Sequence, residues 1–364
     1  MTEDFLLKHL SQRKVQHSFR QLRIPVPGMI DFCSNDYLGL ARSAAMQESV
    51  HTLLQARPYM HGSAGSRLLA GNYAWIEEAE SMLAAFHVSP AALIFNSGYD
   101  ANLGLFSSVP QKGDTIIYDQ LIHASVRDGI RLSKAQAFSF VHNDVEDLRK
   151  KLEHATGNVF VAVESVYSMD GDFALLVEIA AICAAYNAHL IVDEAHATGV
   201  IGVKGEGLAQ QLGIPCFARV HTFGKAVGCH GAVVLGSVAL REFLINFARS
   251  FIYTTALPAT AIAAIMASYD LFPYMHEARS QLTKLIAQFQ AGVQYVLPGS
   301  TPIQIVLTDG NERTRQLAAR LQSAGFDVRA ILHPTVAKGK ERLRIVLHSY
   351  NTEEEVGRLI TSML

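Results

Sequence analysis

The chain has 364 residues, of which 49% are hydrophobic and 18% charged, and its formal net charge is −2. This composition excludes disordered, collagen-like and coiled-coil proteins, and at roughly 150 residues per domain it predicts about two lobes. Basic and acidic residues nearly balance, 31 against 33, so we expect small-molecule partners rather than nucleic acid or a membrane surface.

The N-terminus and the cysteines bear on location. Glu3 and Asp4 stand where a signal peptide carries basic residues, so no export signal is predicted. The apolar stretch Ala256–Phe272 is broken by Pro258 and Asp270 and is too short for a membrane helix. The four cysteines show no CxxC spacing, so we expect no metal site and a reducing, cytoplasmic location.

The first 45 residues are interpreted as an N-terminal segment, with a basic amphipathic helix over Phe5–Arg23. Residues 46–258 are predicted to form a large domain, because helical stretches alternate with short apolar runs typical of parallel βαβ units. The strands expected there are Ala91–Phe95, Asp114–Tyr118, Val159–Val163, His189–Val192 and Gly231–Leu235, and two of the helices are Ala74–His87 and His123–Ser133.

Most of these strands are near-continuous apolar runs, as strands covered on both faces require. We therefore expect a central sheet buried between helices. Asn143 is predicted to cap a further helix, with Glu146 three residues later completing a pattern like a capping box.

Residues 259–364 are predicted to form a small α+β domain. It begins with two long helices, followed by alternating strands and helices. The segments are Ala259–Phe272, His276–Val293, Pro302–Leu307, Asn311–Ala324, Arg342–Leu347 and Thr352–Met363.

An acid and a histidine, Asp193 and His196, follow the apolar strand His189–Val192. Ligands of open α/β sheets bind at the carboxyl ends of strands, so both residues stand where a site is expected. A helicase DEAH box would need a GxxxxGK[ST] phosphate loop, and Gly224-Lys225-Ala226 lacks its hydroxyl. Taken alone, the segment fits equally well a carboxylate that caps the next helix.

Lys225 lies among glycines and apolar residues, unlike most other lysines of the chain. Such a setting would lower its pKa and favour a neutral amine, which Schiff-base chemistry requires. The alternative is a loop lysine whose amine extends into solvent.

Together these segments suit an aldehyde cofactor with a pyridine ring and a phosphate. Lys225 would hold the aldehyde group of this cofactor. The ring nitrogen would then need an acid, and Asp193 is available. Its phosphate would need backbone N–H groups at a helix start, and Gly98 follows a strand in the required strand–turn–helix order. His123, at the start of another helix, is the candidate for a flat partner of the ring.

Eight segments in chain order match the motifs of one known family: Ser34–Leu40 (SNDYLGL), Gly62–Gly71 (GSAGSRLLAG), Asn96–Tyr99 (NSGY), Glu164–Asp172 (ESVYSMDGD), Asp193–His196 (DEAH), Thr222–Lys225 (TFGK), Phe251–Pro258 (FIYTTALP) and Pro334–Val336 (PTV). With them the chain resembles the α-oxoamine synthases, which are fold-type I pyridoxal-phosphate enzymes, from about Phe5 to Met363. The resemblance implies a large domain with a mostly parallel central sheet flanked by helices, a small α+β C-terminal domain, and a homodimer.

The resemblance also implies pyridoxal 5′-phosphate as the cofactor and gives residues their roles. Lys225 would bind the cofactor and remove the Cα proton, Asp193 would pair with the ring nitrogen, His123 would stack on the ring, and His196 would bind the ring hydroxyl. Gly98, Tyr99 and Thr222 would hold the phosphate, and Ser168 would line the pocket. Arg344, assisted by Asn35, would bind the amino-acid carboxylate, and His123 would also bind substrate. Arg20 and Thr335 would contact the acyl substrate.

Members of this family condense a small amino acid with an acyl thioester and release CO₂. The segment Gly65–Leu69 is similar to that of members that join L-alanine to a pimeloyl thioester in biotin biosynthesis. Siblings that use serine or glycine, like serine palmitoyltransferase or 2-amino-3-ketobutyrate CoA ligase, are the alternative, as is an aminotransferase of the same fold. Coenzyme A and an acyl carrier protein both remain open as the thioester carrier.

Overall fold

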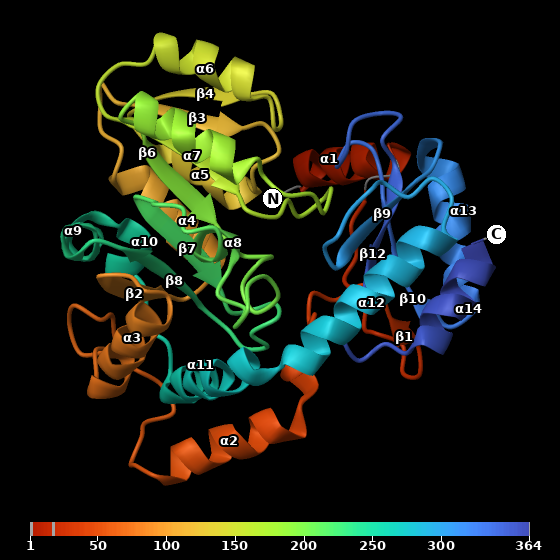
Figure 1. Ribbon diagram of the computed structural model, residues 1–364, viewed down its shortest axis with the longest axis horizontal. Helices are drawn as coiled ribbons and strands as arrows, with labels where there is room; N and C mark the ends of the chain where they lie inside the picture. Colours follow the sequence, from red (N-terminus) through yellow and green to blue (C-terminus); the bar gives the residue numbers. More distant parts are fainter. Residues whose placement is uncertain (1–2, 17–18, 364) are drawn as a thin grey trace. The chain divides into compact units, whose positions relative to one another are not determined.

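The computed structural model describes residues 3–16 and 19–363, and they divide into two compact units (Figure 1). The larger unit comprises residues 35–168 and 172–280, and the smaller one comprises the described residues up to 34, residues 169–171 and those from 281 onward. The predicted boundaries after residues 45 and 258 divide the chain differently. Helix α11 (Ala259–Leu271) packs against α2 (Ala44–Gln55) and α3 (Ala74–Phe86), and therefore stays with the larger unit.

A seven-stranded sheet forms the centre of the larger unit. Its strands, in spatial order, are β2 (Ala91–Phe95), β8 (Ala232–Gly236), β7 (Ala218–Thr222), β6 (His189–Asp193), β5 (Val159–Glu164), β3 (Thr115–Asp119) and β4 (Gln136–Phe140). Strand β8 is antiparallel to both neighbours, and the other strands all share one direction. The prediction of a mostly parallel central sheet is confirmed.

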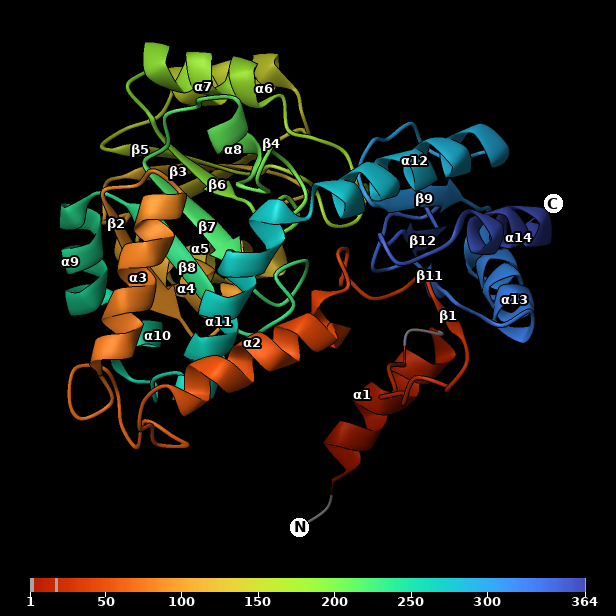
Figure 2. The ribbon, with the colours of Figure 1, turned by 60° about the horizontal axis from the view of Figure 1, so that its bottom comes forward.

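Helices cover both faces of this sheet (Figures 1 and 2). On one face lie α4 (Gly98–Ser108), α5 (Ala124–Leu132), α9 (Val238–Phe247) and α10 (Arg249–Ile252), whose apolar side chains form one buried cluster with those of the strands. Helices α6 (Val145–Glu153) and α7 (Leu176–Ala185) cover the other face, as right-handed crossovers from β4 and β5 require. The short helix α8 (Leu208–Gln211) precedes β7.

The smaller unit is built on a three-stranded antiparallel sheet of β11 (Arg329–Ile331), β12 (Arg342–Val346) and β9 (Ile303–Leu307). Its helices are α13 (Gly310–Ser323), α14 (Glu353–Met363) and most of α12 (His276–Gly292), and a short parallel pair joins β1 (Ile30–Asp31) to β10 (Phe326–Asp327). The predicted α+β character is confirmed.

The N-terminal helix α1 (Asp4–Val15) ends before the predicted Arg23 and buries none of its side chains within the chain. Phe5, Leu7 and Val15 are 65%, 57% and 78% exposed. In the described part of the chain, no helix combines the length and the apolar character that a bilayer crossing demands.

The cap of α6 lies one residue beyond the predicted position. The carboxylate of Asp144 accepts the N–H groups of Glu146 and Asp147, so Asp144 caps the helix. Asn143 has a φ of +55° instead, and its side chain binds outside the helix. Asparagine and aspartate are equally good caps, and the sequence pattern does not distinguish the two adjacent positions.

Two histidines are buried against each other beside β7. The ring centroids of His87 and His221 lie 4.0 Å apart, and both side chains are fully buried. Burial, reinforced by the charge of Arg219, lowers the pKa of His87 to about 3. Burial, His87 and Arg219 also lower the pKa of His221. Both rings are therefore neutral in the folded protein at pH 7.

The free energy of unfolding should fall as the pH decreases below 6.5. The unfolded chain takes up protons on these histidines there, whereas the folded chain resists uptake down to about pH 3 for His87. Between pH 7.5 and 5.5 each histidine should cost about 1.4 kcal/mol of stability. Urea unfolding at both pH values measures this loss, and His87→Gln should lose correspondingly less than the wild type. An equal loss in the two proteins would contradict the assignment.

Candidate active site

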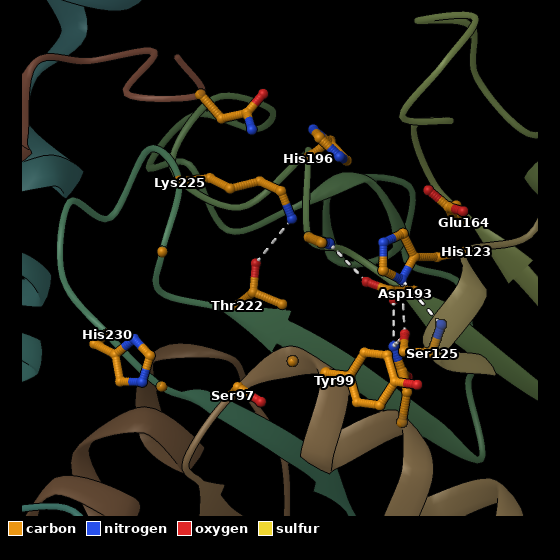
Figure 3. A pocket seen from close by; sticks show the side chains of 16 residues that line it. Ser97, Tyr99, His123, Ser125, Glu164, Asp193, His196, Thr222, Lys225 and His230 are labelled. Atoms are coloured by element: carbon orange, nitrogen blue, oxygen red, sulfur yellow. Dashed lines mark hydrogen bonds between the residues drawn. The ribbon is translucent and has the colours of Figure 1, made fainter. Parts of the chain in front are cut away.

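Polar residues from distant segments of the larger unit meet at one edge of the central sheet. Strands β2, β3, β5, β6 and β7 end at this edge, and β8 begins there. The residues around these strand ends enclose a cavity of about 260 Å³ (Figure 3). Its wall consists of Asn35, Ser97, Gly98, Tyr99, Asn102, His123, Ser125, Glu164, Asp193, Ala195, His196, Thr222, Gly224, Lys225, His230 and Gly231.

Strand alternation aims the key side chains of this wall. Ile191 of β6 and Val220 of β7 point into the apolar cluster beneath α4 and α5. Side chains two positions apart on a strand share a face, so Asp193 and Thr222 point to the same side. They lie at the last residue of each strand, where the apolar cluster gives way to the cavity.

Asp193 is held as a hydrogen-bond acceptor at the base of the cavity. Its Oδ2 accepts from Asn102 Nδ2 at 2.8 Å, and its Oδ1 accepts from the backbone N–H of Ala195 at 2.9 Å. The side chain is only 6% exposed. These two donors orient the carboxylate, whose remaining acceptor capacity suits a cationic N–H of a ligand.

His123 caps α5 and presents its ring to the cavity near Asp193 (Figure 3). Its Nδ1 lies 2.8 Å from Ser125 Oγ, and Ser125 Oγ also accepts from Asn102 Nδ2 at 3.0 Å. Partial burial lowers the pKa of His123, Asp193 opposes this effect and Lys225 adds to it. The lowered pKa favours a neutral imidazole, and the contact with Ser125 orients it, so the ring can lie against an aromatic ligand.

Lys225 is placed by a closed loop after β7. Backbone bonds join Phe223 N to Gly231 O at 2.9 Å and Gly228 N to Lys225 O at 2.8 Å. The lysine Nζ donates to Thr222 Oγ1 at 3.4 Å and lies inside the cavity wall (Figure 3). The amine is thereby held beside Thr222, whose methyl group lies close to Gly98.

A buried tyrosine connects two more of the predicted residues. His196 Nδ1 lies 2.6 Å from the Tyr37 hydroxyl, which in turn donates to Asn35 Oδ1 at 3.2 Å. Tyr37 is fully buried. It therefore fixes His196 and Asn35 together, although the two are far apart in sequence.

An anion cradle lies at the start of α4. Ser97 caps this helix by accepting the N–H of Asp100 at 3.1 Å, and the first-turn N–H groups of a helix attract anions. A Cβ atom at Gly98 would lie 2.4 Å from Thr222 Cγ2, so only glycine permits this close approach. The Tyr99 hydroxyl donates to Asp128, which leaves the backbone N–H of Tyr99 as its contribution to the cradle.

These features fit pyridoxal phosphate. One cavity contains an anion cradle for a phosphate, a lysine amine for an aldehyde and a buried carboxylate for a ring N–H. Two further buried atoms of the wall, Asn102 Oδ1 and Glu164 Oε1, have no hydrogen-bond partner within the described residues. Acceptors left without a partner in a cavity wall are available to a polar ligand or to water.

Four predicted residues are not part of this wall. Ser168 lies next to it, where its backbone N–H faces the carboxyl group of Glu164. Arg20, Thr335 and Arg344 belong to the smaller unit, where Arg20 and Thr335 are exposed and Arg344 is half-buried on β12. Their proposed roles toward substrate stay predictions.

Five residues of the site were not predicted from the sequence: Tyr37, Asn102, Ser125, Glu164 and His230. Two of these residues could have been identified from their positions in the sequence. Asn102 lies one helical turn after Gly98, on the same face of α4. Glu164 ends a buried strand, as Asp193 does, and burial together with the nearby Asp193 raises the pKa of Glu164 well above its ordinary value.

Known proteins share this architecture and much of this sequence. Residues 27–363 match the model of the aminotransferase class I and II family. An 8-amino-7-oxononanoate synthase of Emericella nidulans is 44% identical, over 99% of this chain and 94% of that protein. Serine palmitoyltransferase from S. paucimobilis, solved with a pyridoxal phosphate–myriocin adduct, superposes with a TM-score of 0.88 at 26% identity, over 99% and 96% of the two chains. The 8-amino-7-oxononanoate synthase from Francisella tularensis superposes with a TM-score of 0.80 at 30% identity, over 93% of this chain and 97% of that chain.

Gly98→Ala should weaken binding of pyridoxal phosphate. The added methyl group forces Thr222 out of its position, and a clash of this kind typically costs about 1–3 kcal/mol, or roughly 10- to 100-fold in affinity. Pyridoxal, which lacks the phosphate, should bind the variant and the wild type alike. Equilibrium titrations with both ligands check this, with Gly62→Ala as a control because a methyl group at that position would have no atom within 4 Å. A similar loss for both ligands would place the phosphate elsewhere.

Proposed function

The chain belongs to the aminotransferase class I and II family and, within it, to the α-oxoamine synthases, and from this premise we propose that it condenses L-alanine with a pimeloyl thioester. The products are 8-amino-7-oxononanoate, CO₂ and the free thiol carrier, in a step of biotin biosynthesis. Near-full-length similarity to 8-amino-7-oxononanoate synthases supports this reaction, because the cavity of this chain also fits pyridoxal phosphate.

The enzyme is a pyridoxal-phosphate-dependent acyltransferase. When bound, this cofactor supplies an electron sink that stabilises negative charge at the Cα atom of an amino acid. The cradle at Gly98 and Tyr99, with the Thr222 hydroxyl, would hold the phosphate. The wall geometry supports these assignments, because the three residues lie together at the start of α4.

At the ring, Asp193 would accept the N–H of the pyridine nitrogen, His123 would lie against the ring face, and His196 would bind the ring hydroxyl. Asn102 keeps the Asp193 carboxylate oriented, and Tyr37 keeps His196 oriented. A charge fixed before the reaction begins needs no reorganisation during it, which is the main electrostatic advantage of such a site.

Lys225 would hold the cofactor and, once the amino acid has replaced it, take the proton from Cα. A general base must be neutral and within hydrogen-bond reach of the proton that it removes. The contact between Lys225 Nζ and Thr222 Oγ1 supports this role, because it keeps the amine inside the cavity.

Residues that match the family's substrate-binding positions would bind the two substrates. Arg344 would bind the amino-acid carboxylate through two parallel N–H groups, a geometry that lysine does not offer, and Asn35 would assist it. Arg20 and Thr335 would contact the acyl group, and Ser168 would support the cofactor pocket. Either coenzyme A or an acyl carrier protein would carry the thioester.

We further propose a cytoplasmic homodimer. Large apolar side chains on the surface support a second copy: Met60 is 65% exposed, Leu69 86% and Tyr253 71%, in addition to the side chains of α1. The four cysteines support a reducing compartment, since all of them are free thiols.

A purified-enzyme assay tests the function and its nearest alternative. L-alanine with pimeloyl-CoA should release free thiol and yield 8-amino-7-oxononanoate, detected by mass spectrometry, whereas serine or glycine should turn over at least about tenfold more slowly. Greater turnover of serine with a long-chain acyl-CoA would indicate an activity like that of serine palmitoyltransferase, which is also among the structural relatives.

Lys225→Ala is the matched control for this assay. It should retain no covalent cofactor after borohydride reduction and should show no turnover, because no other lysine among the described residues lines the cavity. Absence of thiol release from the wild type with every amino acid tested would refute the proposal.

A further inference from the structure

A histidine outside the cavity bridges two carboxylates. His142 Nδ1 lies 3.0 Å from both oxygens of Asp119, and His142 Nε2 lies 2.7 Å from Asp172 Oδ2. A carboxylate only accepts hydrogen bonds, so both ring nitrogens must donate and the ring must be the imidazolium. The Asp119 side chain is fully buried, and those of His142 and Asp172 are 18% and 35% exposed.

The charges facing the ring agree with this protonation state. Burial lowers the pKa of His142, but the hydrogen bonds to Asp119 and Asp172 outweigh it and raise the pKa to about 10. The neighbouring Tyr167 presents its ring edge-on, with the two ring centroids 4.4 Å apart. At pH 7 to 8 the bridge therefore consists of one cation between two anions.

Asp119, at one end of the bridge, stabilises the turn that leads to His123. Asp119 is the last residue of β3, and its Oδ1 also accepts the backbone N–H of Leu121 at 2.8 Å. Its carbonyl accepts the N–H of Ile122 at 3.0 Å. His123 follows directly, so the orientation of the Asp119 side chain sets the start of α5 and the ring in the cavity wall.

Asp172, at the other end, belongs to the hairpin that follows Glu164. Asp172 O accepts the N–H of Tyr167 at 3.0 Å, and Val166 pairs with Phe173 in an antiparallel bridge. Ser168 lies in the turn of this hairpin. Asn143, next to His142, adds a bond from its Nδ2 to Asp172 Oδ2 at 3.2 Å.

We propose that His142 is a positioning residue of the active site, which as a cation holds the His123 turn and the Ser168 hairpin in one fixed arrangement. The identity of the ligand rests on the proposed function, but the bridge itself rests on the contacts above. Without the cation, two carboxylates lose their common partner, and the fully buried Asp119 keeps neutral donors, such as the backbone N–H groups of Leu121 and Asn143, but loses its cationic one. The turn before His123 then relaxes, and the ring moves within the wall.

The test compares His142→Gln with Arg241→Gln. Arg241 is the matched control, because it too bridges two carboxylates, Glu77 at 2.9 Å and Glu80 at 2.8 Å, and none of these three residues lines the cavity. Apoenzyme is titrated with pyridoxal phosphate, and the visible circular dichroism of the bound cofactor reports its orientation. Thermal unfolding of each variant shows how much stability it has lost.

His142→Gln should weaken pyridoxal phosphate binding about 10- to 100-fold and reduce the visible dichroism, since small displacements in a site have effects of this size. Arg241→Gln should lose stability but keep the affinity within about twofold, because distant sites act independently. Adding Asp172→Asn to His142→Gln removes one unpaired charge and should recover part of the affinity. If His142→Gln does not fold, Asp172→Asn alone removes one arm of the bridge and should show the same signature more weakly.

Three results would overturn the inference: wild-type affinity and dichroism in His142→Gln, an equal loss of affinity in Arg241→Gln, or no recovery in the double variant. The proposed function fails separately. A wild-type protein that binds pyridoxal phosphate but makes no 8-amino-7-oxononanoate would refute that function and leave the role of His142 intact.

Discussion

Parallel strands bring their carboxyl ends to one edge of a sheet, and the site of this protein depends on that constraint. Strands β2, β3, β5, β6 and β7 end at the edge where the cavity lies, and the antiparallel β8 starts there. Wall residues from segments far apart in the sequence, such as Ser97 and His230, thus meet at this edge. The two-residue period of the strands then directs Asp193, Glu164 and Thr222 to the side occupied by α4.

The two buried carboxyl groups of the cavity have different surroundings. Asp193 has a hydrogen-bond donor on each oxygen, whereas one oxygen of Glu164 has no partner in the described structure, and burial next to Asp193 raises the pKa of Glu164. His123, whose pKa is lowered by partial burial, and the Lys225 amine line the same cavity.

The regular elements were predictable where one physical cause dominates. Strand β2 was predicted to the residue and β5 and β6 to within one residue, because strands covered on both faces are continuously apolar. Strand β4 was missed, since Gln136 to Ser139 are exposed and form no continuous apolar run, whereas β2 is buried along its length although it is the other edge strand. The bond between Tyr37 and His196 spans 159 positions, and no local pattern reveals such a pair. The roles of Arg344 and Thr335 came from family resemblance alone, because composition and spacing say nothing about them.

The central claim is that Asp193 supplies the fixed negative charge on which reaction at Cα depends. Exchange of the Cα proton of L-alanine in D₂O, followed by NMR with saturating pyridoxal phosphate, measures that reaction before any acyl transfer. Asp193→Asn should keep the fold and slow the exchange by about 10²- to 10³-fold, the size of effect seen when one electrostatic contact is lost from an enclosed site. Exchange at the wild-type rate in a variant that still binds the cofactor would contradict the placement of the ring against Asp193.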